Sequence, residues 1–191
     1  MRSRTLLAAA ALLPVLAACD PGDPQPVDRV EDTVAAPVGQ MSAATVGQTV
    51  DGYVTAAAMG DMYEIAAAEI ALQRSQTPAV RELATMLRDD HTAASQRMQT
   101  LVPQAAPQAQ IPTELDQRRE GLLENLRTAP ATNFDEIFMS QQVAAHEEAL
   151  TLHRGFADTT EAPALAEHAR TVVPRLEAHL EMARRGTGPA T

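Results

Sequence analysis

Four side chains on four predicted helices have the types and the spacing that favour metal chemistry: Glu64, His91, His146 and His179. Imidazole nitrogens and carboxylate oxygens are ligands of Zn, Cu, Fe and Ni. Glu64 lies 14 residues before Pro78, and His91 lies 13 residues after it. In two antiparallel helices that turn at this proline, both side chains are expected at the same height, about 20 Å from the turn.

The second pair matches in the same way. His146 lies 17 residues before Pro163 and His179 lies 16 residues after it, so both are expected about 24–25 Å from their turn. A helix of about 25 residues is about 38 Å long, which puts both pairs near mid-height. The spacing therefore predicts one layer of polar side chains in the core of a helical bundle.

Two interpretations of this layer are open. A buried histidine is often a hydrogen-bonded polar group that fixes the register of its helix, and a structural polar layer is the simpler expectation. A transition-metal site (Zn, Cu, Fe or Ni) or a small-ligand site is the alternative. Polar atoms that converge within about 4–5 Å would favour the site, whereas side chains that point apart toward backbone or acidic partners would favour the structural layer.

Known catalytic patterns do not match this sequence. The di-iron site of ferritin-like proteins needs a Glu-x-x-His pair on each of two helices. The residue three positions before His91 is Arg88, and the one three before His179 is Leu176, so that site is excluded. The sequence also has no phosphate loop, dinucleotide fingerprint or nucleophile elbow. These observations favour a protein that is not an enzyme.

Five helices must position the four side chains. They are expected over about 49–75, from 78 to just before Pro103, for a short stretch after Thr113, from Phe134 onward, and over 163–186. Thr77 before a proline and Asn133 before Phe134 are typical residues at a helix start. Pro174 lies inside the last helix and is expected to kink it.

Apolar residues on the second and fifth helices recur at alternating steps of four and three, which indicates packing seams. The two seams are Val80, Ala84, Leu87, His91, Ala94, Met98 and Leu101, and Leu165, Ala169, Val172, Leu176, His179 and Ala183. The connection over about 102–132 is long. The sequence therefore predicts an all-α fold, an antiparallel four-helix bundle of ferritin-like type, with two hairpins joined by a long crossover that holds a short extra helix.

The first 48 residues are expected to export and tether the domain. Residues 1–18 have a positive start and a short apolar stretch, which is typical of a signal peptide. The following Leu16-Ala17-Ala18-Cys19 resembles the bacterial lipobox, so we expect lipid on Cys19 and anchoring to the periplasmic side of the inner or outer membrane. Residues 19–48 are expected to be a disordered proline-rich acidic tether, 49–186 the bundle, and 187–191 a tail.

Charge and cysteine content exclude several partners. The net charge is −10, and removal of Arg2 and Arg4 with the signal peptide takes it to −12. A negative protein repels phosphate backbones, so no nucleic-acid partner is expected. The single cysteine excludes an internal disulfide and cysteine-only metal sites.

Several short segments resemble one bacterial family. They are Glu64-Ile65, Asp90-His91, Phe134-Asp135, His146, and the run from Pro174 to Leu180. Their order and spacing over about 52–183 are similar to domain-of-unknown-function family 4142. The resemblance implies an exported, ferritin-like helical protein without an established activity. We therefore expect a non-catalytic protein that binds an unidentified protein partner or belongs to the cell envelope, with a metal- or small-ligand-binding bundle as the alternative.

Overall fold

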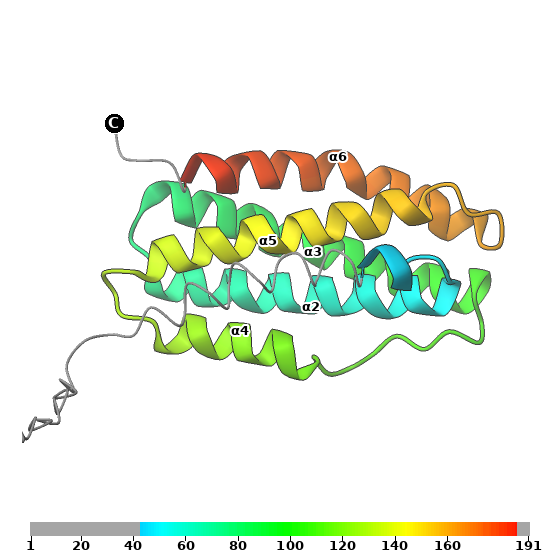
Figure 1. Ribbon diagram of the computed structural model, residues 1–191, viewed down its shortest axis with the longest axis horizontal. Helices are drawn as coiled ribbons and strands as arrows, with labels where there is room; N and C mark the ends of the chain where they lie inside the picture. The colour runs from blue at the N-terminus through cyan, green and yellow to red at the C-terminus, as the bar shows by residue number, and fades with distance from the viewer. Residues whose placement is uncertain (1–42, 187–191) are drawn as a thin grey trace, which may run out of the picture.

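The computed structural model describes residues 43–186, and the prediction of an all-helical fold is confirmed over this range (Figure 1). The helices are α2 Val50–Arg74, α3 Pro78–Ala105, α4 Gln117–Thr128, α5 Phe134–Phe156 and α6 Pro163–Gly186. None of the helices in this range is long and apolar enough to cross a membrane.

The four long helices contact one another in a closed ring. α2 packs on α3, α3 on α6, α6 on α5, and α5 on α2, while the short α4 lies against α2 and α5 (Figure 1). The consecutive helices α2 and α3 form one hairpin, and α5 and α6 form the other. The connection between the hairpins carries α4, so α4 covers the outside of the seam between α2 and α5.

Local sequence explains where the helices start. α3 begins at Pro78 and α5 at Phe134, as the sequence predicted. The Thr49 hydroxyl accepts a hydrogen bond of 3.1 Å from the Gly52 backbone N–H and caps α2. Glycine is needed at this position because a Cβ on Gly52 would lie 2.2 Å from the Val46 carbonyl oxygen.

Two boundaries differ from the expectation. α3 continues past Pro103 to Ala105, because a proline in the last turn removes only one N–H, and the Ala106 N–H still closes that turn on the Val102 carbonyl at 2.9 Å. α4 begins four residues after Thr113. Its N-cap is Asp116, whose carboxylate accepts the Arg119 N–H at 2.8 Å and caps a helix better than threonine does.

Residues 43–48 also differ from the expectation of a tether. Ala43 to Val46 form a helical turn, and the Gly47 N–H donates to the Ala43 carbonyl at 2.9 Å. Ala43 is buried, and a Cβ on Gly47 would lie 3.0 Å from the Leu152 side chain on α5. The folded domain therefore includes at least these six residues before the expected boundary.

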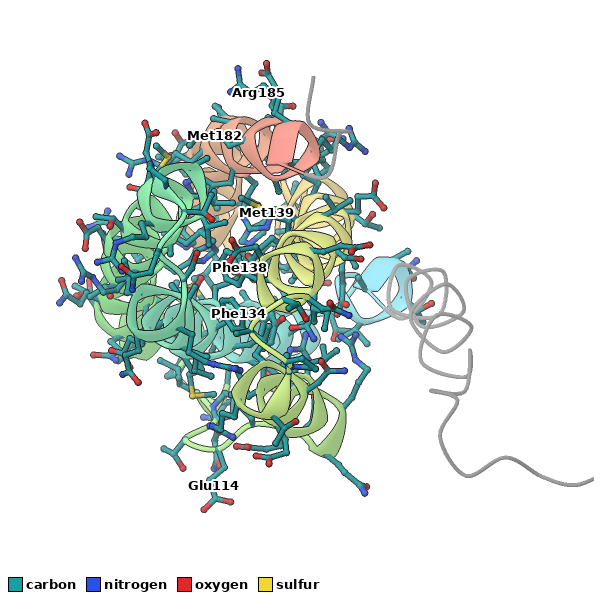
Figure 2. All side chains as sticks on the ribbon, turned by 90° about the vertical axis from the view of Figure 1, so that its left-hand side faces the viewer. Glu114, Phe134, Phe138, Met139, Met182 and Arg185 are labelled. Atoms are coloured by element: carbon teal, nitrogen blue, oxygen red, sulfur yellow. The ribbon has the colours of Figure 1, made fainter. Side chains whose placement is uncertain are left out.

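Two large apolar clusters fill most of the core, one toward each end of the helices, and a smaller third cluster joins Leu150 on α5 to Leu176 and Leu180 on α6. The first includes Leu83, Leu87, Leu126, Phe134 and Phe138, and the second includes Tyr53, Met98, Leu152, Phe156 and Leu165. Figure 2 looks along the helices and shows Phe134, Phe138 and Met139 between them, while Glu114 and Arg185 extend outward. Along α3, α5 and α6, one histidine each separates the two clusters.

Candidate metal centre

Three histidines converge in the buried layer between the apolar clusters. His91 on α3, His146 on α5 and His179 on α6 are 6%, 1% and 1% exposed. One ring nitrogen from each lies within 4.8 Å of the others. The His146 Nε2 to His179 Nδ1 distance is 3.3 Å. Helical spacing thus brings together three of the four side chains predicted for the site.

Each of these histidines also has a hydrogen-bond acceptor on its outer side. The pairs are His91 Nδ1 with Asp61 Oδ1 at 2.8 Å, His146 Nδ1 with the Gln142 carbonyl oxygen at 2.8 Å, and His179 Nε2 with Asp90 Oδ2 at 3.0 Å. A carboxylate or carbonyl oxygen can only accept, so the outer nitrogen of each ring carries the proton. This is the usual environment of a histidine that binds a metal.

The outer hydrogen bonds leave lone pairs on the inner nitrogens. In the neutral rings, His146 Nε2 and His179 Nδ1 direct two lone pairs toward each other across 3.3 Å. His91 Nε2 is buried and has no hydrogen-bond partner within residues 43–186. Such an arrangement is electrostatically unfavourable unless a cation lies among the three nitrogens.

The spacing is close to that of a metal centre. Zn–N bonds of about 2.0–2.1 Å in tetrahedral geometry separate two ligand nitrogens by about 3.4 Å. The inner nitrogens of His146 and His179 already have this separation. The His91 nitrogen, within 4.8 Å of the others, has to move by about 1 Å to complete the set.

Electrostatics keeps two of the rings neutral. Burial lowers the pKa of His146 well below its ordinary value, and positive charge on His91 or His179 would lower it further. Burial and charge on His91 also lower the pKa of His179, although the Asp90 carboxylate opposes this. At neutral pH, His146 and His179 are therefore in the form that ligates metals.

The pKa of His91 is shifted in the opposite direction. Burial lowers the pKa of this histidine, but the hydrogen bond that it donates to Asp61 and the charges of Asp61, Glu64 and Asp90 outweigh burial, so that the net pKa is raised. In the absence of a metal, His91 is the ring that most readily takes up a proton. A metal ion would compete with that proton for the same inner nitrogen.

Glu64, the fourth predicted ligand, is buried on the outer side of His146. Its Oε1 lies 3.8 Å from His146 Nδ1, and its Oε2 makes no hydrogen bond within the described chain. Burial raises its pKa to about 7, although the charge of His91 and the Gln142 side chain act in the opposite direction. Glu64 is therefore a neighbour of the histidine cluster, outside the three converging nitrogens.

Sequence reasoning missed the outer acceptors. Asp61 lies one helical turn before Glu64, and Gln142 lies one turn before His146. This spacing could have indicated that both residues lie next to the predicted site. Asp90 adjoins His91 in sequence, and neighbours on a helix face different ways. Its carboxylate meets His179 on the adjacent α6. This pairing depends on how α3 and α6 are rotated against each other, which the sequence did not indicate.

A second pair of histidines lies beside the cluster. The Tyr53 hydroxyl and His153 Nδ1 are 3.1 Å apart, and the rings of His153 and His168 are 6.4 Å apart. His153 follows His146 by seven residues on α5, a spacing that corresponds to two helical turns. Both side chains are buried in the structure, so the spacing does mark one inward face of α5.

A cavity of about 80 Å³ opens onto the histidine layer from the seam between α2, α4 and α5. Asp61, Glu64 and His91 line its inner part. Alanines form much of the wall, and Arg118, Arg119 and Glu148 also line it. Arg118 and Arg119 both pair with Glu148, at 2.6 and 3.0 Å, and Arg119 also pairs with Asp116.

Over residues 43–186, these features define an all-helical domain with a buried cluster of three histidines, each oriented by an outer acceptor. The chain belongs to the family described as Domain of unknown function (DUF4142), whose model matches residues 35–185. No specific function is indicated for that family. Searches of curated proteins and of solved structures gave no match.

Proposed function

We propose that this protein binds one transition-metal ion through His91, His146 and His179. The observation that carries the proposal is the pair of inner nitrogens at 3.3 Å, whose lone pairs face each other because both outer nitrogens donate to oxygen acceptors. A proton is a poor bridge here because burial lowers the pKa of both rings. A metal ion satisfies all three inner nitrogens at once.

The donor set limits the choice of ion. Imidazole nitrogens suit Zn, Cu, Fe and Ni, whereas Mg and Ca prefer oxygen ligands. The carboxylates of Asp61 and Asp90 do not bind the ion themselves. They offset the charge of a divalent ion through their hydrogen bonds to the outer nitrogens of His91 and His179. Their hydrogen bonds also make the histidines stronger donors.

The proposal includes the architecture and the location of the site. We infer that the four long helices form an antiparallel four-helix bundle of ferritin-like type, with the metal layer between its two apolar clusters. The ring of helix contacts supports this inference. The lipobox-like segment ending at Cys19 lies outside the described residues and supports export, lipid attachment and a periplasmic, membrane-anchored position.

Thermal unfolding tests the metal site directly. The full chain is used with Cys19→Ser, so that its only thiol cannot bind added metal. After treatment with a chelator, Zn, Cu, Fe(II) and Ni are added in turn. At an ion concentration about 100 times Kd, a binding ion should raise Tm by roughly 5–10 °C, because it binds the folded state alone.

Two variants make the result specific. His179→Leu removes one inner nitrogen, while its partner Asp90 keeps its ion pair with Arg175, so the fold should persist and the metal-dependent rise should disappear. His168→Leu is the matched control, a buried histidine outside the cluster, and it should keep the rise. If no ion shifts Tm, the metal proposal is wrong and a structural polar layer in a partner-binding or envelope protein remains.

A further inference from the structure

Gly60 on α2 leaves open space where other residues would have a side chain. A Cβ built on Gly60 meets no atom within 4 Å, although the residue is only partly exposed. Glycine in the middle of a helix costs about 1 kcal/mol relative to alanine. No local steric requirement explains Gly60. It does line the cavity that reaches the histidine layer.

The rest of the cavity wall follows the same pattern. Ala56 and Ala57 on α2 and Ala144 and Ala145 on α5 also line the cavity. Small side chains on both helices keep the seam from closing over the histidines. At about 80 Å³ the cavity is smaller than the roughly 150 Å³ that holds a benzene ring. It fits water or a ligand of two or three non-hydrogen atoms.

The inner end of the cavity contains groups that lack partners. His91 lines it, and His91 Nε2 is buried without a hydrogen bond within the described residues. Glu64 lines it as well, and its Oε2 is also buried without a hydrogen bond there. Of the three converging histidines, His91 alone lines the cavity, so a lone-pair donor that enters it would approach the metal from the side of His91.

We propose that the metal centre keeps one exchangeable coordination position, which opens into this cavity and takes water or a small monodentate ligand of two or three non-hydrogen atoms. This rests on the proposed metal site. Three histidines supply three of the four ligands that a tetrahedral ion takes, and within residues 43–186 no carboxylate joins their converging nitrogens. The ligand forms a coordinate bond from its lone pair to the ion and displaces a bound water.

The test uses Co(II) as the metal and azide as the ligand. The visible absorption bands of Co(II) depend on its coordination, so they report first the uptake of the metal and then the exchange of its ligand. The full chain with Cys19→Ser is compared with the same chain carrying Gly60→Leu or Gly155→Leu. Gly155 is a matched control, because it lies on α5, is exposed, has no atom within 4 Å of an added Cβ and does not line the cavity.

All three proteins should take up Co(II) equally. Azide should then change the bands of the parent and of Gly155→Leu, while Gly60→Leu should bind azide at least tenfold more weakly. Equal azide binding by the two glycine variants, or no azide binding by a Co(II)-loaded parent, would overturn the exchangeable position and leave the metal site standing. A parent that takes up no Co(II) would overturn the metal site, and this inference with it.

Discussion

The residue Asp61 is 7% exposed, and its Oδ1 lies 2.8 Å from His91 Nδ1. The two groups therefore have to be considered together when either is replaced. From the sequence alone, His91→Leu is expected to be tolerated if the histidine is only a polar spacer. The structure changes that expectation, because leucine would leave the buried Asp61 oxygen without its donor.

His91→Leu should lower the free energy of unfolding of the metal-free protein by about 1–3 kcal/mol. Adding Asp61→Leu should restore much of this loss, since removing both polar partners is less costly than removing one. Urea unfolding in the presence of a chelator, with both single variants and the double variant, measures the coupling. If the effects of the two substitutions simply add, Asp61 and His91 do not act as a pair.

His153 should make the fold sensitive to acid. Burial lowers its pKa from 6.5 to about 3, and charge on His168 would lower it further. The unfolded chain thus binds a proton that the folded chain excludes between these pH values. The contribution of His153 to stability is complete above pH 6.5 and is lost progressively as the pH falls toward 3.

Urea unfolding of the chelator-treated protein at pH 7, 6 and 5 measures this effect. The free energy of unfolding should fall by up to about 1.4 kcal/mol per pH unit for one such group. In His153→Leu, the free energy of unfolding should fall less as the pH is lowered, because one buried neutral histidine is missing. His146 and His179 should still cause part of the decrease. An unchanged slope in this variant would show that His153 does not carry the effect.

At the scale of the helices, Arg74 joins the end of α2 to the end of α4. Its guanidinium donates to the carbonyl oxygens of Leu126, Arg127 and Ala129 and lies 4.7 Å from the centroid of the Phe134 ring. A positive group at a helix C-terminus satisfies free carbonyls and complements the helix dipole.

Arg74→Met should keep the apolar part of the side chain and lose these interactions. We expect a loss of about 1–3 kcal/mol in unfolding free energy, together with faster amide hydrogen exchange in α4 than in the wild-type protein. Arg127→Met, at an exposed ion pair on α4 itself, is a suitable comparison and should change little. Unchanged exchange in α4 would mean that Arg74 does not hold this helix.

The helical glycines should respond differently to alanine. Gly155→Ala should stabilise the protein by about 0.5–1 kcal/mol, because its Cβ would meet no atom within 4 Å and alanine favours a helix. Gly52→Ala should destabilise it, because its Cβ would lie 2.2 Å from the Val46 carbonyl oxygen. Thermal unfolding of both variants checks the two signs, and a loss of stability in Gly155→Ala would contradict the first.

The number of residues between each site residue and its helical turn predicted more of the site than the search for known sequence motifs did. The rise per residue is fixed by backbone hydrogen bonds, so the common height of His91, His146 and His179 followed from their distances to Pro78 and Pro163. The rotation of each helix is set by packing of the whole core, which is not visible in a single sequence. That is why the position of Glu64 outside the cluster was not foreseen.

At the scale of the whole molecule, the sequence predicted the helices well and their boundaries less well. The error at Pro103 came from applying a rule for helix interiors to a last turn, where little hydrogen bonding is lost. Residues 43–48 were assigned to the tether from their composition. Their contact with Leu152, more than 100 residues away in sequence, carries no local signal.

Lipid attachment gives a prediction for the entire protein in a cell. The wild-type chain should be recovered with membranes and released by detergent, whereas Cys19→Ser should be released without detergent, because Cys19 is the only thiol available for the lipid. Fractionation followed by mass spectrometry of the N-terminal peptide measures both outcomes. A wild-type protein without a lipid mass on Cys19 would contradict the expected anchor.

The three converging nitrogens come from α3, α5 and α6, and α2 supplies none of them. An ion held there would tie three long helices together directly. It would leave α2 attached through side-chain packing and through hydrogen bonds such as those of Asp61, Tyr53 and Tyr63. The metal would therefore restrain α2, the helix that carries Gly60, less directly than it restrains the other three long helices. A small outward movement of α2 would then admit a ligand to the cavity, while the coordination of the metal by the three histidines remains intact.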